Sequence, residues 1–130
     1  MKYMSTGIID TNTIQETAGA ALGDIRGLAL KYDGESGKVV KCSVAGETVL
    51  GIGILTNDED IAADAQVNIQ IQAIGVAMAG DTVAKGDPLT TNENARLVKA
   101  STGNFVIGYA LADAVAGGMF KVQVCKGATL

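Results

Sequence analysis

The feature that most constrains the fold is an internal repeat, in which two stretches of the chain carry the same order of strand and turn residues. Residues 38–54 read KVVKCSVAGETVLGIGI, and residues 96–111 read RLVKASTGNFVIGYAL. When the two stretches are aligned with a one-residue gap in the loop, identical residues match at five positions outside the loop. The matched pairs are Val40 and Val98, Lys41 and Lys99, Ser43 and Ser101, Val49 and Val106, and Gly51 and Gly108. A unit of about 58 residues that occurs only twice is too long and too rare for a repeat array. The repeat therefore predicts one domain built by duplication.

From Gly23 onward, apolar and polar residues alternate with a period of two, which is typical of strands. The expected strands are residues 28–31, 39–43, 49–55, 66–72, 73–79, 88–91, 97–99, 106–111 and 119–125. Gly51, Gly53 and Gly108 fall inside strands, where we expect them to mark bends of a small barrel. The predicted fold class is all-β, a barrel or sandwich with repeated strand blocks at about 23–72 and 80–125.

Residues 1–22 lie outside this repeat and are rich in small polar residues. We expect them to form an extended N-terminal arm, followed by a single β domain over residues 23–130. A frayed terminus is the alternative. Spaced isoleucines in such an arm could add a strand to the edge of a neighbouring sheet. The candidate contact residues of the arm are Lys2, Tyr3, Ile8, Ile9 and Ile14.

The composition excludes several classes of function. The chain has no histidine, so it cannot form a His-assisted nucleophile or complete a Cys–His zinc site. The 10 basic residues are outnumbered by 14 acidic ones, which disfavours binding to nucleic acid. The longest apolar run, at 73–80, is far shorter than the roughly 20 residues of a membrane span. We therefore expect a protein that is not an enzyme, with no cofactor, no metal, no nucleic acid and no membrane segment.

The apolar content predicts a partner surface. Apolar residues make up 48% of the chain and charged residues only 18%, which is more apolar surface than one small domain usually hides. We therefore expect an oligomer or a partner interface. The N-terminal sequence lacks the hydrophobic core of a signal peptide, so we expect synthesis and retention in a cytoplasm.

The two cysteines and an acidic loop each allow more than one interpretation. Cys42 and Cys125 are expected to be free thiols, although a disulfide would be possible if both strand ends lay at one pole of the barrel. The acidic loop NDEDIAADA at 57–65 is longer than its counterpart in the second block, so it is an insertion. Its carboxylates could bind calcium, but their spacing fits no calcium-loop pattern. A solvated acidic loop is the favoured interpretation.

The second block carries a family resemblance. Residues 80–124 read GDTVAKGDPLTTNENARLVKASTGNFVIGYALADAVAGGMFKVQV, with a Gly-Asp-Pro-Leu strand entry, an Ile-Gly-Tyr-Ala-Leu strand and a final Val-x-Val strand. This pattern resembles the small capsid cement, or decoration, proteins of tailed bacteriophages. The resemblance implies a small β-barrel or β-tulip that is made in the host cytoplasm and sits on the exterior of the virion capsid. It also implies a homotrimer that binds the major capsid protein, stabilises the mature shell and has no enzymatic activity.

A virion decoration protein is therefore the leading hypothesis, with the arm residues as capsid or intersubunit contacts. The alternative is a surface-adhesion or carbohydrate-binding β module, but the aromatic residues on which sugars usually stack are few. A carrier of lipoyl or biotinyl groups would need a lysine on a tight hairpin. Lys38 and Lys85 lie near turns, but neither has a flanking attachment motif.

Overall fold

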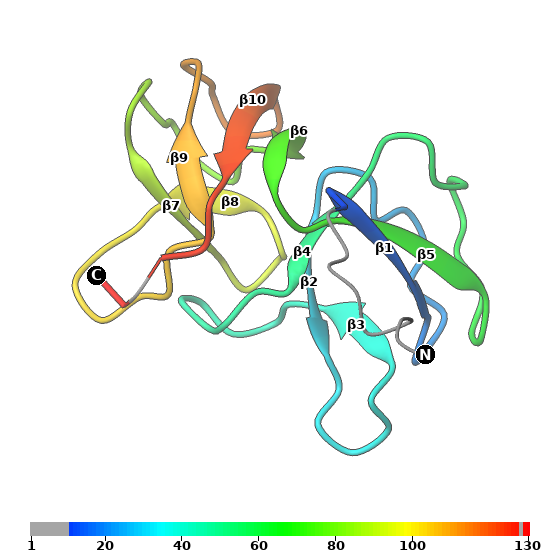
Figure 1. Cartoon of the computed structure of the whole chain (residues 1–130). Coiled ribbons are helices and arrows are strands. Elements are labelled where there is room, and N and C mark those ends of the chain that lie inside the picture. The colour runs from blue at the N-terminus through cyan, green and yellow to red at the C-terminus, as the bar shows by residue number, and fades with distance from the viewer. Residues whose placement is uncertain (1–10, 128) are drawn as a thin grey trace, which may run out of the picture.

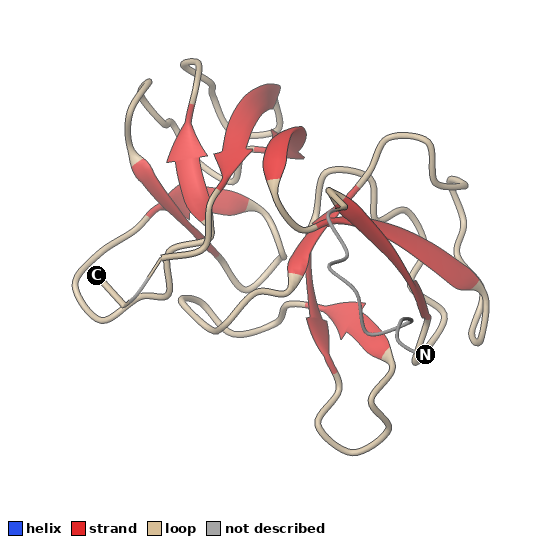
Figure 2. Ribbon diagram, in the orientation of Figure 1, coloured by secondary structure: helices blue, strands red, loops and turns tan. Residues whose placement is uncertain are grey.

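The computed structural model describes residues 11–127 and 129–130, and within these ranges it contains strands and turns but no helix (Figures 1 and 2). The strands are β1 (Thr13–Thr17), β2 (Ala29–Tyr32), β3 (Val39–Lys41), β4 (Gly51–Gly53), β5 (Gln66–Gln70), β6 (Ala73–Met78), β7 (Pro88–Thr91), β8 (Leu97–Lys99), β9 (Gly108–Ala110) and β10 (Met119–Val124). The prediction of an all-β fold is confirmed.

The strands form two antiparallel sheets with the same connectivity. The first has the order β1-β5-β4-β2-β3, and the second has the order β6-β10-β9-β7-β8. Each strand of the first sheet therefore has an equivalent five strands later in the chain. Figure 1 shows the two sheets as separate bodies, with β1–β5 on one side and β6–β10 on the other. The duplication that the sequence indicated is thus present in the sheet topology.

The duplicated unit begins earlier than the sequence predicted. β1 lies within the segment expected to be an arm, yet it pairs with β5 from Thr13 opposite Gln70 to Thr17 opposite Gln66. β6 pairs with β10 in the equivalent register. The first half therefore starts at β1, and residues 1–10 of the predicted arm remain to be placed. These residues lie outside the part of the chain that the structure describes.

Each sheet curls until its first and last strands approach one another. A single parallel bridge joins Ala18 to Val39 in the first half, and an equivalent bridge joins Ala79 to Leu97 in the second. One bridge is not a ladder of hydrogen bonds, so each sheet is curled but open. The expected single barrel is therefore replaced by two curled sheets, an arrangement compatible with a sandwich or a β-tulip.

Two equivalent glycines explain how tightly each sheet can curl. A β-carbon at Gly51 would collide with the backbone oxygen of Gln70, and one at Gly108 would collide with that of Gln123. Each glycine thus allows the backbone of the adjoining strand to come close. The sequence predicted bends at these positions, and the structure gives close strand approach as the reason for glycine.

The two halves share one of the two hydrophobic cores. The first core belongs to the first half alone and includes Leu30 and Ile69. The second combines the interior of the second half with four residues from the outer face of the first half. Those four residues are Ala29, Cys42, Val49 and Ile52. Ile52 reaches furthest in, since it lines one small internal space together with Leu89, Leu97, Ile107 and Val122. The first half therefore fills one end of the second.

The two halves differ at a matched pair of positions near this end. The Tyr32 hydroxyl, at the end of β2, donates a hydrogen bond to the Glu16 carboxylate on β1. Tyr32 is largely exposed, whereas the residues at the same positions of the second half are Thr91 and Ala77, which are small and fully buried. The two halves are therefore not interchangeable at these positions.

Candidate functional site

The outer faces of the two halves differ where their strands are equivalent. The outward positions of β6 and β10 are Ile74, Val76, Met78, Met119, Lys121 and Gln123. We call this set the β6–β10 face. The equivalent outward positions of β1 and β5 are Thr13, Gln15, Thr17, Gln66, Asn68 and Gln70. The same backbone thus carries only polar side chains in the first half, whereas four of the six are apolar in the second. The fold does not require apolar residues there, so the β6–β10 face is a candidate interaction surface.

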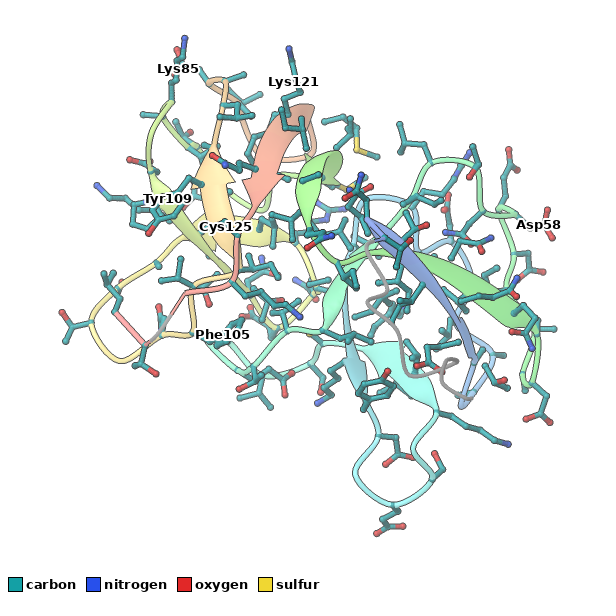
Figure 3. All side chains as sticks on the ribbon, viewed as in Figure 1. Asp58, Lys85, Phe105, Tyr109, Lys121 and Cys125 are labelled. Atoms are coloured by element: carbon teal, nitrogen blue, oxygen red, sulfur yellow. The ribbon has the colours of Figure 1, made fainter. Side chains whose placement is uncertain are left out.

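Exposure supports this interpretation. Ile74 is 59% exposed and Met119 is 45% exposed, which is high for side chains of this size. Tyr109 on β9 lies opposite Gln123 and is 41% exposed, so it extends the surface sideways. Figure 3 shows Lys121 and Tyr109 projecting outward from the second sheet. The surface is therefore mostly apolar and carries one positive charge.

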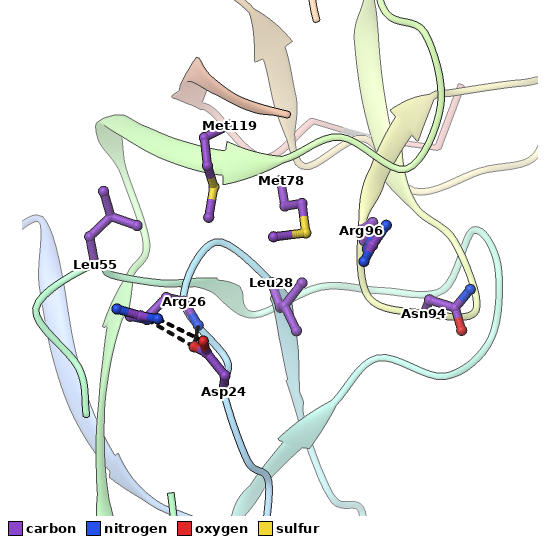
Figure 4. Close-up of a pocket in the computed structure, with 8 residues that line it drawn as sticks. All are labelled: Asp24, Arg26, Leu28, Leu55, Met78, Asn94, Arg96 and Met119. Atoms are coloured by element: carbon purple, nitrogen blue, oxygen red, sulfur yellow. Dashed lines mark hydrogen bonds and ion pairs between the residues drawn. The ribbon is translucent and has the colours of Figure 1, made fainter. Parts of the chain in front are cut away.

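A groove between the halves continues this face. It has a volume of about 730 Å³ and receives four residues from each half. Its lining residues are Asp24, Arg26, Leu28, Leu55, Met78, Asn94, Arg96 and Met119 (Figure 4). Two of them, Met78 and Met119, also belong to the β6–β10 face. An apolar floor that includes Leu28 is thus flanked by two arginines.

One of these arginines is held in place by a carboxylate. Arg26 donates from Nε and a terminal nitrogen to the two oxygens of Asp24, at 2.9 and 2.8 Å (Figure 4). The side-chain hydrogen bonds from Arg26 lower the pKa of Asp24, so the pair stays ionised at neutral pH. The guanidinium is positioned by its neighbour, and Arg96 supplies the second positive charge at this groove.

The two thiols lie in different environments. Both cysteines are free, with Cys42 buried in the shared core and Cys125 exposed after β10. Burial raises the pKa of the Cys42 thiol to about 12, which makes it a poor nucleophile near neutral pH. The structure therefore assigns a packing role to Cys42, and the interpretation of two free thiols is confirmed.

The start of the acidic insertion is anchored by a buried amide. Asn57 donates from Nδ2 to the backbone oxygens of Ile54 and Asn68 at 2.9 and 2.8 Å, and its Oδ1 accepts from the Asn68 N–H at 2.9 Å. The carboxylates that follow, including Asp58, are exposed (Figure 3). Among the residues described, no three His, Cys, Asp or Glu side chains gather as metal ligands. Asn57 therefore fixes the start of the loop and leaves its carboxylates in solvent.

The predicted arm residues fall into two groups. Lys2, Tyr3, Ile8 and Ile9 lie outside the described residues. Ile14 is half-buried on β1, where it lies opposite Ile69 and packs against the core of the first half. The structure therefore gives Ile14 a packing role in its own chain, and its contact with a partner stays a prediction.

The four aromatic side chains that the structure describes do not form one platform. Phe120 is buried, Tyr109 lies on the outer face of the second half, and Tyr32 and Phe105 line a separate groove. No helix within the described ranges has the length and apolar character needed to cross a membrane. The β6–β10 face and its adjoining groove remain the candidate interaction surfaces.

Comparison with known proteins identifies the family. A family model described as phage cement protein matches residues 4–125. The chain belongs to the phage cement protein family. Among solved structures, this cement protein is similar to the head fiber gp8.5 N base of bacteriophage phi29, with a TM-score of 0.64 and 21% sequence identity over 91% of this chain and 96% of that chain. At this identity the likeness shows a shared fold. No curated protein matches the chain.

Family membership confirms the resemblance that the second block indicated, and it makes this cement protein a structural protein of a phage virion. The β6–β10 face was not found from the sequence. A signal was present, since TIQET at 13–17 and IGVAM at 74–78 occupy equivalent strands. Those segments share no residues in register, so only the topology makes them comparable.

Proposed function

We propose that this cement protein is a non-enzymatic virion protein that binds the outer surface of the phage capsid as a homotrimer and stabilises the mature shell. Its partner is the major capsid protein. The observation that carries the proposal is the family match, which runs through both halves of the chain. The exposed apolar β6–β10 face supports it, because such a face on a small protein is typical of an interaction surface.

The mechanism is mass action. A subunit that binds the mature shell but not the immature shell lowers the free energy of the mature form by its binding free energy. A trimer gains further, because after one subunit binds, the other two face their sites at a high effective concentration. Neither step requires a catalytic group, a metal or a cofactor.

The N-terminal segment supplies contacts to the capsid or to neighbouring subunits in this proposal. Lys2, Tyr3, Ile8 and Ile9 are its contact residues. β1 begins at Thr13, so a deletion that reached it would remove an edge strand and confuse loss of binding with loss of fold. Deletion of residues 2–10 is therefore the appropriate variant. Its control is a chain of equal length in which residues 2–10 are replaced by glycine and serine.

Co-sedimentation with purified heads of the source phage tests the proposal. We expect the intact protein to sediment with mature heads and not with immature ones, and to raise the temperature at which mature heads release DNA. Both the deletion and the glycine-serine chain should lose binding while keeping the melting temperature of the body. Equal binding to both kinds of head, or full binding by the deletion variant, would contradict the respective part of the proposal.

The homotrimer has its own measurement. Light scattering of the purified protein should give a mass of about three times 13.2 kDa. A mass of 13.2 kDa at every concentration would remove the homotrimer from the proposal for the free protein, without affecting the test of capsid binding.

A further inference from the structure

The β6–β10 face is apolar in only one of two equivalent halves, so its chemistry reflects something that the fold itself does not need. Ile74 and Val76 on β6 stand where Thr13 and Gln15 stand on β1. Both strands lie at the edge of a curled five-stranded sheet. The change from polar to apolar side chains at these outward positions indicates that another segment covers β6 and that none needs to cover β1.

The backbone of β6 has N–H and C=O groups along its outer edge that can pair with another strand. The Met78 N–H points away from β10 and donates to the Gly27 oxygen at 2.9 Å. Hydrogen-bonded and non-bonded positions alternate along an antiparallel pair, so Ile74 and Val76 also direct their N–H and C=O groups to this outer edge. No backbone hydrogen bond among the described residues uses these groups at Ile74 or Val76. The edge can therefore accept an added strand.

The chain contains a segment whose composition suits pairing with the edge of β6. Residues 1–10 read MKYMSTGIID and place two isoleucines, Ile8 and Ile9, close to the point where the chain enters β1. An extended segment of ten residues spans at most about 33–36 Å, which is much longer than β6. The segment can therefore lie along the whole outer edge of such a strand.

The segment leaves its own body at a fixed point. The Thr11 carbonyl accepts a hydrogen bond from the Gln72 side chain at 2.6 Å, which places the exit point beside the start of β6. The Gln70 side chain donates in turn to the Gln72 carbonyl. A β-carbon at Gly75 would point inward, as the side chain of its partner Val122 does, and would lie only 3.1 Å from Gln70. Gln70 thus lies over the inward face of β6 and leaves its outward side chains uncovered.

We infer that the β6–β10 face binds the N-terminal segment of a second copy of this chain, with Ile8 and Ile9 of that copy packed along the outer edge of β6. The inference rests on the homo-oligomer of the proposed function and names its contact surface. The segment is joined to the first half and the receiving face lies on the second half. Two copies can exchange such segments reciprocally about a twofold axis, and three or more copies can pass them in one direction around a ring, which is the arrangement that a homotrimer uses.

Cross-linking between separate chains tests the inference. In a Cys125→Ser background, chains with Ile9→Cys are mixed with chains with Val76→Cys and exposed to a mild oxidant. The matched control replaces Val76→Cys by Gln15→Cys, which puts the thiol at the equivalent outward position of the first half. We expect the disulfide between chains to form at least ten times faster with Val76→Cys than with Gln15→Cys. Non-reducing electrophoresis measures the product at twice the chain mass.

Several results would overturn the inference. Equal rates with the two partners would show that the face is not selective. Cross-linking confined within single chains, in a variant that carries both Ile9→Cys and Val76→Cys, would place the segment on its own body. An oligomeric parent that gives no disulfide with Val76→Cys would leave the homo-oligomer intact and remove this contact. A parent that is monomeric throughout would contradict both this contact and the homotrimer of the free protein, and would leave the test of capsid binding unaffected.

A graft between the halves gives a second measurement without new thiols. The double variant Ile74→Thr and Val76→Gln gives β6 the outward residues that β1 already carries, so the fold tolerates them in this setting. We expect its association constant to fall at least tenfold, with the melting temperature of the body retained. Val44→Thr serves as the control, because Val44 is 58% exposed in a loop of the first half. An unchanged mass for the graft, or an equal loss with Val44→Thr, would overturn the inference.

Discussion

Replacement of Ile52 by alanine measures how firmly the two halves are joined. Ile52 belongs to the first sheet, is 1% exposed, and projects into the interior of the second half. The substitution removes three side-chain carbons, which corresponds to about 2.4 kcal/mol at roughly 0.8 kcal/mol for each buried methylene. The unfilled cavity adds to this, so the free energy of unfolding should fall by about 2–5 kcal/mol.

The duplicated fold supplies a matched control. Tyr109 occupies the position of Ile52 in the second half but is 41% exposed, so Tyr109→Ala should cost about 1 kcal/mol or less. Urea unfolding followed by circular dichroism distinguishes the two variants. With a slope of roughly 2 kcal/mol per M, the midpoint should drop by about 1–2.5 M for Ile52→Ala and by less than about 0.5 M for Tyr109→Ala. Equal shifts would refute the interpretation that Ile52 packs inside the second half.

Three further outcomes are expected. Gly108→Ala should lower the free energy of unfolding by about 2 kcal/mol or more, because the new methyl group meets the backbone of β10, whereas Gly34→Ala has open space and should change it by less than about 0.5 kcal/mol. Burial acts to raise the pKa of Glu47, but hydrogen bonds from a lysine and two backbone N–H groups outweigh it and hold the pKa below 4.5. Its contribution to stability is thus complete above pH 4.5 and lost as pH falls through the lowered value, so urea midpoints of Glu47→Gln should decline less over that acid range than those of the parent. A thiol reagent at pH 8 should modify Cys125 alone in the folded protein and Cys42 only after unfolding, and two reactive thiols in the native state would contradict the burial of Cys42.

The clearest strands, β5 and β10, were predictable because their buried faces keep a period of two. QVNIQI at 66–71 shows this, since Val67 and Ile69 are fully buried and the residues between them are not. The expected strand ranges also paired correctly between the blocks, because the matched residues fall at the same places in both sheets. Local pattern and global fold agree in these regions.

β1 could not be predicted because its evidence lies in tertiary pairing. TIQET has one half-buried apolar residue, Ile14, and the remainder is polar, which reads as a loop or an arm. Its partner β5 supplies the hydrogen bonds that make it a strand. The two halves share identical residues mainly in strands whose side chains are mostly buried. β1 and β6 share none, so a comparison by residue identity missed the first strand of the unit.

The candidate surface was hidden for a related reason. Exposed apolar residues are common on single strands, so Ile74 and Val76 alone indicate little. Their meaning comes from comparison with Thr13 and Gln15, and that comparison requires the equivalence of β1 and β6. The packing of Ile52 inside the second half could not be predicted from the sequence either. An isoleucine in GIGIL is equally compatible with a side chain that points into the core of its own sheet.

The way Ile52 enters the second half bears on how a duplicated chain avoids endless polymerisation. Each half offers one end that can receive and one face that can insert, so identical units could stack from molecule to molecule without limit. The halves of this chain are unlike at the positions that matter. Tyr32 and Glu16 of the first half stand where the small residues Thr91 and Ala77 stand in the second. Tyr109 of the second half stands where Ile52 stands in the first, and it is exposed. The insertion of one half into the other is thus completed within a single chain, and any larger assembly is left to other surfaces.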